Sequence, residues 1–160
     1  YTDQLVTRTA GKFKFFCYSN LIDGTEHFAL VRGNIAEQDE VLVRVQKLNY
    51  ISDLFQGVLS KNNHNEKDIP INRIMREMQN IKKGVIVIIK DNRGIFEWNK
   101  DKKGSDNTES QEFREYGVGA QILRDIGVRK MVLMTNSKKA IIGLQGFDLK
   151  IVGHKELRNE

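Results

Sequence analysis

The segment best suited to binding an anion is residues 135–139, Thr-Asn-Ser-Lys-Lys. It follows the apolar run Met-Val-Leu-Met, which predicts a buried strand, and it precedes a predicted short helix. Free backbone N–H groups and the helix dipole at such a junction favour an anion. Lys138 or Lys139 could add a point charge and Thr135 a hydroxyl, which suits phosphate. A plain helix N-cap with two solvated lysines is the simpler alternative.

Two further segments place charged side chains at the expected ends of elements. Arg93-Gly94 follows the aliphatic run of residues 85–89, at the kind of strand end where ligands gather in α/β sheets. Glu112 and Arg114 open a predicted helix, and two residues apart they do not share one helix face. Near a bound nucleotide they could still act as acid–base and electrostatic groups. An exposed turn arginine and a surface charge cluster are the alternatives.

The residue inventory excludes several common chemistries. Cys17 is the single cysteine, so the chain can form neither an internal disulfide nor a multi-cysteine zinc site. The three histidines, His27, His64 and His154, lie far apart and form no recognised metal spacing with their acidic neighbours. No G-x-S-x-G, Walker loop or G-x-G-x-x-G occurs. We therefore expect no bound metal and no cofactor.

Charge and hydropathy narrow the classes of partner. The 160 residues carry a net charge of +5 and a pI of about 9.3, which allows an anionic ligand. Acidic and basic residues interleave, however, so we expect no nucleic-acid partner. The longest aliphatic run, residues 85–89, is too short to cross a membrane, and the N-terminus has no signal-peptide pattern. The single cysteine also suits a reducing compartment, which predicts a cytoplasmic location.

The elements that must position these residues differ between the two halves of the chain. Antiparallel-looking β structure is expected first, because alternating apolar residues indicate half-buried strands and Asp23-Gly24 indicates a hairpin turn. The predicted strands are residues 12–18, 27–32 and 41–45. Polar composition predicts a mobile loop over residues 50–69, centred on 60–68, and a second mobile segment over residues 100–107.

The second half alternates strands and helices. A helix is expected to start near Pro70 and stop at Gly84, with a core-facing apolar stripe that includes Met75 and Met78. A strand buried on both faces is expected over residues 85–89. The remaining predicted elements are a helix from the Thr108/Gln111 capping box to Gly127, a strand over 131–134, a short helix ending before Gly146 and a strand over 148–152.

The long helix has its own sequence pattern. Its predicted buried face holds Phe113, Tyr116, Ala120 and Leu123. Gly117 and Gly119 weaken a helix, so we expect them to permit a close backbone approach. Together the elements predict an α+β to α/β fold in a single domain over residues 11–160, with residues 1–10 as a linker from a preceding domain.

Taken together, these segments resemble GTP cyclohydrolase II, the first enzyme of riboflavin synthesis. Residues 114–131, REYGVGAQILRDIGVRKM, are similar to the family's RDYGVGAQILRDLGVRKM. Residues 135–139 are similar to its T-N-N-P-K-K with one residue fewer, and residues 27–33 to its H-x-A-L-V-x-G. The resemblance extends from about residue 11 to residue 152 and implies the family's single-domain fold.

The departures from the family pattern fall on its metal site. The family binds zinc through a cysteine after H-S-E and a C-x-C pair about ten residues later. Here the family's R-V-H-S-E-C is Arg44-Val45-Gln46-Lys47-Leu48-Asn49, and the polar residues 60–68 replace the C-x-C region. In the family, zinc makes the hydroxide that attacks the guanine ring and releases formate. The resemblance therefore implies a domain without zinc and without hydrolase activity.

Other family positions are retained in part. The resemblance places Glu112 at the proton-accepting Asp of the family and Arg114 at its nucleophilic Arg. It implies nucleotide or phosphate contacts by a further set, which is Arg44, Arg93, Thr135 and Lys139. The family's Q-E-G-R-G becomes Lys-Asp-Asn-Arg-Gly at residues 90–94, and the segment with its catalytic Tyr is largely deleted.

The resemblance implies a role within a longer riboflavin enzyme. In many bacteria this domain follows 3,4-dihydroxy-2-butanone 4-phosphate synthase, and the absence of an initiator methionine before Tyr1 fits a domain cut from such a chain. We expect a structural or homodimerising partner of that synthase with weak GTP or phosphate binding. The alternatives are a nucleotide sensor, or an active GTP cyclohydrolase II with an altered metal site. The active enzyme would convert GTP to 2,5-diamino-6-ribosylamino-4-pyrimidinone 5-phosphate, formate and pyrophosphate.

Overall fold

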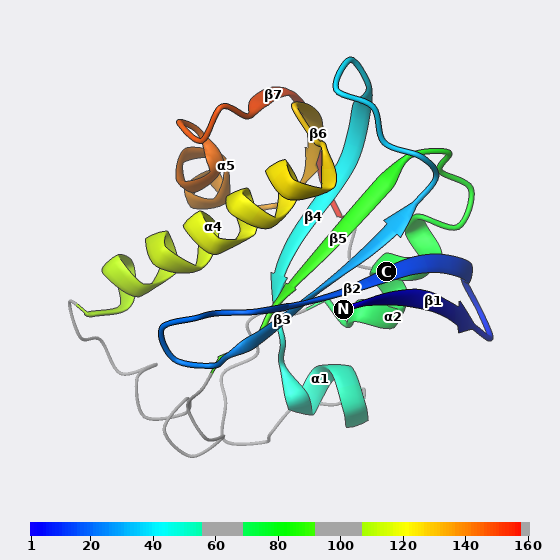
Figure 1. The fold of residues 1–160 in the computed structure, drawn as a ribbon, viewed down its shortest axis with the longest axis horizontal. Coiled ribbons are helices and arrows are strands. Elements are labelled where there is room, and N and C mark those ends of the chain that lie inside the picture. Colours follow the sequence, from blue (N-terminus) through cyan, green and yellow to red (C-terminus); the bar gives the residue numbers. More distant parts are fainter. Residues whose placement is uncertain (56–68, 92–106, 158–160) are drawn as a thin grey trace.

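The computed structural model describes residues 1–55, 69–91 and 107–157, and these residues form a mixed sheet with helices on both faces (Figure 1). The strand order is β1-β2-β3-β5-β4-β6-β7. The strands are β1 (Thr2–Thr7), β2 (Gly11–Ser19), β3 (Glu26–Arg32), β4 (Glu40–Lys47), β5 (Gly84–Ile89), β6 (Lys130–Met134) and β7 (Lys150–Lys155). The helices are α1 (Tyr50–Phe55), α2 (Ile71–Glu77), α4 (Asn107–Ile126) and α5 (Lys138–Leu144).

The sheet changes from antiparallel to parallel pairing at β5. Strands β1, β2, β3 and β5 pair antiparallel, whereas β4 pairs parallel with both β5 and β6, and β6 pairs parallel with β7. This confirms the α+β to α/β fold, with antiparallel strands first and alternating strands and helices later. The carboxyl ends of β4, β5 and β6 consequently meet at one edge of the sheet, which is where ligands bind in parallel sheets.

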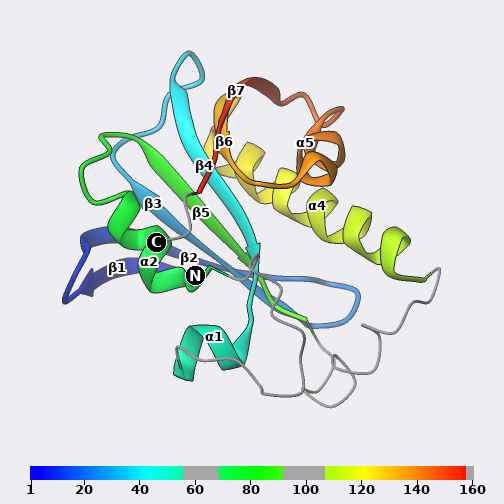
Figure 2. The ribbon, with the colours of Figure 1, turned by 180° about the vertical axis from the view of Figure 1, so that it is seen from behind.

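Strand β5 separates two hydrophobic cores. All six of its residues are buried, which confirms the expected strand covered on both faces. Val85, Val87 and Ile89 pack in the core beneath α4 and α5, while Ile86 and Ile88 pack in the core beneath α2. Figures 1 and 2 show these helices on opposite sides of the sheet. Met78 is fully buried and Met75 packs beside it in the second core, as predicted from their spacing.

Four element boundaries differ from the sequence predictions. Thr2–Thr7, in the linker expected over residues 1–10, form β1 and pair with β2 along their whole length. Tyr50–Phe55 form α1 rather than a loop, because hydrogen bonds to the side chains of Asn49 and Asp53 stabilise this segment in place of apolar packing. Helix α2 ends at Glu77, and Gly84 instead begins β5. Strand β7 begins at Lys150 because Asp148 has a φ of 59°, which is incompatible with an extended strand.

Helix α4 lies close against the sheet through Gly119. A Cβ atom on Gly119 would lie 3.1 Å from Val45 Cγ1 of β4, which confirms the expected close approach at this glycine. Ala120 and Leu123 are buried as predicted, whereas Phe113 is half exposed because the start of the helix extends past the first core. Gly127, with a φ of 101°, ends the helix as expected.

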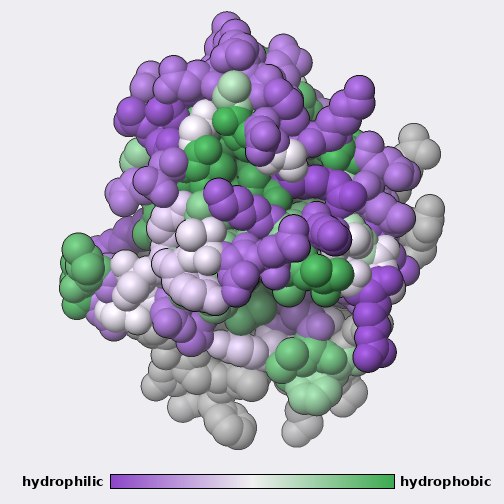
Figure 3. Space-filling view, turned by 45° about the vertical axis from the view of Figure 1, so that its right-hand side comes forward, coloured by the Kyte–Doolittle hydropathy of each residue, from purple (hydrophilic) through white to green (hydrophobic). Residues whose placement is uncertain are grey.

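The face of the molecule shown in Figure 3 is mostly polar. Hydrophilic side chains cover most of the face shown in Figure 3, with small apolar areas between them, in keeping with the interleaved charges of the sequence. Within the residues that the structure describes, no helix has the length and apolar character needed to cross a membrane. The mobile segments expected at residues 60–68 and 100–107 lie outside the described residues, apart from Asn107.

Candidate functional site

A pocket of about 160 Å³ lies at the carboxyl ends of the parallel strands β4 and β6. Besides residues of β4 and the residue after β6, its lining includes residues of α1, α4 and α5. The described residues that line it are Arg44, Val45, Gln46, Lys47, Asn49, Ser52, Ile69, Tyr116, Thr135, Ser137 and Ala140. Two cations and several hydroxyl groups therefore converge at the sheet edge where the topology predicts a ligand site.

Arg44 is fixed to the wall of the pocket by hydrogen bonds. Its Nη1 donates to the carbonyl oxygen of Met134 at 3.0 Å, which connects β4 to the end of β6. Its Nε donates to Gln46 Oε1 at 3.2 Å, and Gln46 Nε2 donates to the carbonyl oxygen of Ile69 at 2.7 Å. Gln46 is buried, so this chain of bonds holds the guanidinium in one orientation.

Thr135, rather than Ser137, organises the turn into α5. The Thr135 hydroxyl is buried and accepts a hydrogen bond from the Ser137 backbone N–H at 3.0 Å. Ser137 occupies the N-cap position of α5, but its side chain makes no capping bond. The Asn136 side chain bonds both backbone polar groups of Leu157, which ties the C-terminal segment to this turn.

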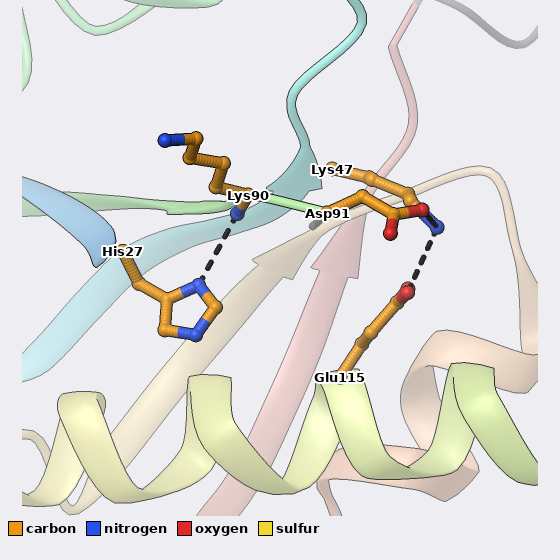
Figure 4. Close-up of polar contacts among 5 residues, drawn as sticks. All are labelled: His27, Lys47, Lys90, Asp91 and Glu115. Carbon is orange, nitrogen blue, oxygen red and sulfur yellow. Dashed lines mark hydrogen bonds and ion pairs between the residues drawn. The ribbon is translucent and has the colours of Figure 1, made fainter. Parts of the chain in front are cut away.

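A lysine bridges two carboxylates beside the pocket. Lys47 Nζ lies 2.9 Å from Asp91 Oδ2 and 2.8 Å from Glu115 Oε1 (Figure 4). Lys47 ends β4, Asp91 follows β5 and Glu115 belongs to α4, so three elements meet at one ammonium group. The Asp91 and Glu115 side chains are only 9% and 21% exposed, which limits solvent screening of both ion pairs.

The predicted site residues do not include this cluster, although the sequence carries one sign of it. Lys47 and Asp91 stand at or just beyond the carboxyl ends of β4 and β5, which pair in parallel. Two charged residues at adjacent parallel strand ends are expected to lie close together. Recognising that β4 and β5 are neighbours required the topology, because 36 residues separate Lys47 at the end of β4 from Gly84 at the start of β5 (84 − 47 − 1).

A buried histidine lies next to the same cluster. His27 of β3 is 5% exposed, and its Nδ1 accepts a hydrogen bond from the Lys90 backbone N–H at 3.2 Å (Figure 4). Burial lowers the pKa of His27, Lys90 lowers it further, and the charge of Asp23 opposes the shift. His27 is therefore neutral at pH 7 and acts as a hydrogen-bond acceptor that fixes the strand end before Asp91.

Asn49 and Asp53 build the helix that forms one side of the pocket. Asn49 Oδ1 accepts hydrogen bonds from the backbone N–H groups of Ile51 at 3.1 Å and Ser52 at 3.3 Å, which makes Asn49 the N-cap of α1. Asp53 Oδ2 accepts from the Asn49 N–H at 2.8 Å, and its Oδ1 accepts from the Ile71 N–H at 2.9 Å. One carboxylate thus joins the start of α1 to the start of α2.

The structure brings together some of the predicted site residues. Arg44 and Thr135 both line the pocket. Lys139 is exposed on the first turn of α5 and Arg114 is exposed on α4, and neither is among the residues that line the pocket. Arg93 lies outside the described residues. Glu112 lies within α4, but its side chain is also outside the description.

The described residues offer few donors for a metal ion. Within residues 1–55, 69–91 and 113–157, no three His, Cys, Asp or Glu side chains gather in a way that could hold one. Cys17 lies on β2 opposite Phe28 of β3. The pocket is lined instead by amides, hydroxyl groups and cations, which suit hydrogen bonding to an anion.

Comparisons with known proteins connect this geometry to a family. The family model described as GTP cyclohydrolase II matches residues 2–156. "Bifunctional riboflavin biosynthesis protein RIBA 1, chloroplastic" of Arabidopsis thaliana is 34% identical over 97% of this chain and 32% of its own length. "Monofunctional riboflavin biosynthesis protein RIBA 2, chloroplastic" of the same plant is 38% identical over 89% of this chain and 30% of its own. "Riboflavin biosynthesis protein RibBA" of Bacillus cereus is 36% identical over 89% of this chain and 38% of its own. The chain thus spans about a third of the length of these relatives.

Proposed function

Because the chain belongs to the GTP cyclohydrolase II family, we propose that it is a riboflavin-pathway domain of that family which binds no zinc and does not hydrolyse GTP. The proposal rests on the residues that stand at the positions of the family's H-S-E-C. In this chain the segment ends in the cap of α1 and includes the lysine that bridges Asp91 and Glu115.

The donors at this segment do not fit zinc. The family's site uses three thiolates, and the single cysteine of this chain lies in β2, away from the segment. Asn49, at the position matching the first zinc-ligating cysteine, uses its side-chain oxygen to cap α1. Lys47 adds a positive charge that would repel a metal ion in the same place. We therefore assign no hydrolytic step to this domain.

A structural role follows from the fold that remains. Apolar side chains pack into two cores on the two faces of the sheet, so the domain can offer a folded surface to another part of a longer protein. The names of some relatives, which are called bifunctional, support a fused 3,4-dihydroxy-2-butanone 4-phosphate synthase as that part. We propose that this domain packs on, or dimerises with, such a synthase in the cytoplasm.

The pocket favours a second candidate function, the binding of a small anion. Arg44 and Thr135 line it together, and the resemblance to the family implies a nucleotide or phosphate contact for both. Its volume of about 160 Å³ is below the roughly 300–1000 Å³ of sites for larger ligands. A phosphate group fits such a space better than a whole nucleotide, which favours weak phosphate binding over GTP sensing.

Genetic complementation tests the proposed function. The chain would be expressed in a bacterium that lacks GTP cyclohydrolase II, and growth would be measured without riboflavin. An active family member provides the positive control, and immunoblotting shows that this chain accumulates. We expect no growth from this chain. Riboflavin-independent growth would overturn the proposal and favour an active enzyme with an altered metal site.

A further inference from the structure

We propose that the outer edge of β1 is a strand-pairing surface that fits a second copy of this chain, and that the Asp3 carboxylate keeps it closed. The inference goes beyond the proposed function and does not rest on it. It starts from the strand order, in which β1 is the outermost strand of the antiparallel half of the sheet (Figure 1). In the described part of the chain, β1 pairs with β2 alone. Its other side therefore presents the backbone polar groups of an edge strand.

The register with β2 shows which residues of β1 face outward. The Cys17 backbone N–H donates to the Tyr1 carbonyl oxygen at 2.8 Å, and the Tyr1 nitrogen donates to the Cys17 carbonyl oxygen at 3.2 Å. These two residues form a hydrogen-bonded pair, and the register continues without a shift along the whole of β1. In an antiparallel ladder such residues alternate with residues whose backbone groups point away from the partner strand. The backbone groups of Thr2, Gln4 and Val6 consequently point to the open edge.

The side chain of Asp3 covers the middle of this edge. Its Oδ1 accepts a hydrogen bond from the Gln4 backbone N–H at 2.7 Å, and its Oδ2 accepts one from the Tyr1 hydroxyl at 2.7 Å. Because the Gln4 N–H points outward, Oδ1 lies where the carbonyl oxygen of an added strand would bind. The hydrogen bonds from Tyr1 and Gln4 lower the pKa of the Asp3 carboxyl, so it is negatively charged at pH 7. That charge also repels the carbonyl oxygen of an approaching strand.

The two edges of the sheet are protected in different ways. Strand β7, at the opposite edge, has a lysine at each end, Lys150 and Lys155, and its register with β6 shifts after Met131. Lysines and an irregular register are common means of preventing edge strands from pairing. Strand β1 has an unbroken register with β2, and Asp3 is its one charged residue. Protection of this edge therefore depends on Asp3.

A second copy of the chain is the partner that this edge fits. Each copy offers the same three outward-facing residues, which supply both N–H donors and carbonyl acceptors. Two β1 strands can pair antiparallel about a twofold axis at Gln4, which places Thr2 of each copy opposite Val6 of the other. Both residues are β-branched and favour strands, and Val6 is 63% exposed, so pairing would also bury apolar surface. The pairing needs the Gln4 N–H of each copy, which Asp3 binds in wild type.

Sedimentation velocity of purified variants tests the inference. Asp3→Ala removes the carboxylate. Glu40→Ala, on the internal strand β4, is the matched control because it removes another exposed acid and changes the net charge equally. We expect Asp3→Ala to self-associate at a concentration about tenfold or more below that required by wild type, because the Gln4 N–H becomes available. Glu40→Ala should behave like wild type.

A second substitution shows whether this association uses the edge of β1. Val6→Pro removes an outward N–H that does not pair with β2, and proline is tolerated at such edge positions. The double variant Asp3→Ala, Val6→Pro should therefore return to the wild-type degree of association. Circular dichroism verifies the fold of each variant. Asp3→Val replaces Asp3→Ala if that variant does not fold, and Val6→Lys, which places a charge on the edge, likewise replaces Val6→Pro.

Three results would overturn the inference. The first is a folded Asp3→Ala variant that associates no more than wild type. The second is a Glu40→Ala variant that associates as strongly as Asp3→Ala, because loss of any exposed acid would then suffice. The third is association of Asp3→Ala that survives the substitution of Val6, because the contact would then lie elsewhere on the surface.

Discussion

Asn49 offers a direct test of whether this segment caps a helix or is a remnant of a metal site. Its side-chain oxygen accepts two backbone hydrogen bonds at the start of α1, at 3.1 and 3.3 Å. Asn49→Ala leaves both N–H groups without that acceptor. Loss of an N-cap costs about 1 kcal/mol, with a range of roughly 0.5–2 kcal/mol. For a chain of this size, about 1 kcal/mol corresponds to a fall in Tm of roughly 2–4 °C.

Urea unfolding and calorimetry measure this effect. Asn49→Asp provides the matched control, because aspartate caps helices about as well as asparagine and should lose less than about 0.5 kcal/mol. Asn49→Cys restores the family's residue but supplies a poor cap, so we expect it to lose stability like Asn49→Ala. We also expect added zinc not to recover that loss. Equal stability of all four proteins, or recovery of Asn49→Cys by zinc, would refute the assignment of Asn49 as a cap.

Three further results follow from the packing, the buried histidine and the pocket. Gly143→Ala should lower the free energy of unfolding by about 1–3 kcal/mol, because the added Cβ atom would lie 2.5 Å from the ring of Tyr116 in α4. Gly117→Ala, with its nearest neighbour at 3.4 Å, should be neutral or stabilising by up to about 1 kcal/mol in urea titrations. Because the pKa of His27 is lowered in the folded protein, the stability that neutral His27 contributes is present above its unfolded pKa of about 6.5 and is lost as pH falls below it. Calorimetry from pH 7.5 to 5 should therefore show a loss of stability that is smaller in His27→Gln than in wild type. The same dependence of stability on pH in both proteins would contradict the assignment of His27 as neutral. Phosphate raises the Tm of a protein that binds it, and this rise should be smaller in Arg44→Gln than in Lys139→Ala. An equal reduction of the rise in both variants, relative to wild type, would place the anion outside the pocket.

The sequence predicted the buried parts of the fold better than its edges. Aliphatic runs such as residues 85–89 predict buried strands directly, because burial on both faces leaves no polar position. Helix α1 was missed because it is stabilised by hydrogen bonds that the side chains of Asn49 and Asp53 accept, and polar residues of this kind are equally common in loops. Strand β1 was missed because most of its side chains are exposed, so its pairing with β2 is its main support.

The candidate site was predictable only in part. Arg44 within β4 and Thr135 directly after β6, which the motifs identify as candidates, both line the pocket. The bridge from Lys47 to Asp91 and Glu115 joins three segments that are distant in sequence, and only the strand order brings them together. Lys139 was expected at the same anion site, yet the first turn of α5 leaves it exposed and outside the pocket lining.

Formate release from GTP, measured with purified protein and added zinc, tests the central claim most directly. An active member of the family provides the positive control, and bound zinc is quantified in the same samples. We predict no stoichiometric zinc and no formate release above the buffer control. In terms of rate, this means less than about 0.01 turnovers per second, whereas enzymes typically reach at least about 1 per second. Zinc-dependent formate release above that rate would contradict the account and identify the chain as an active GTP cyclohydrolase II.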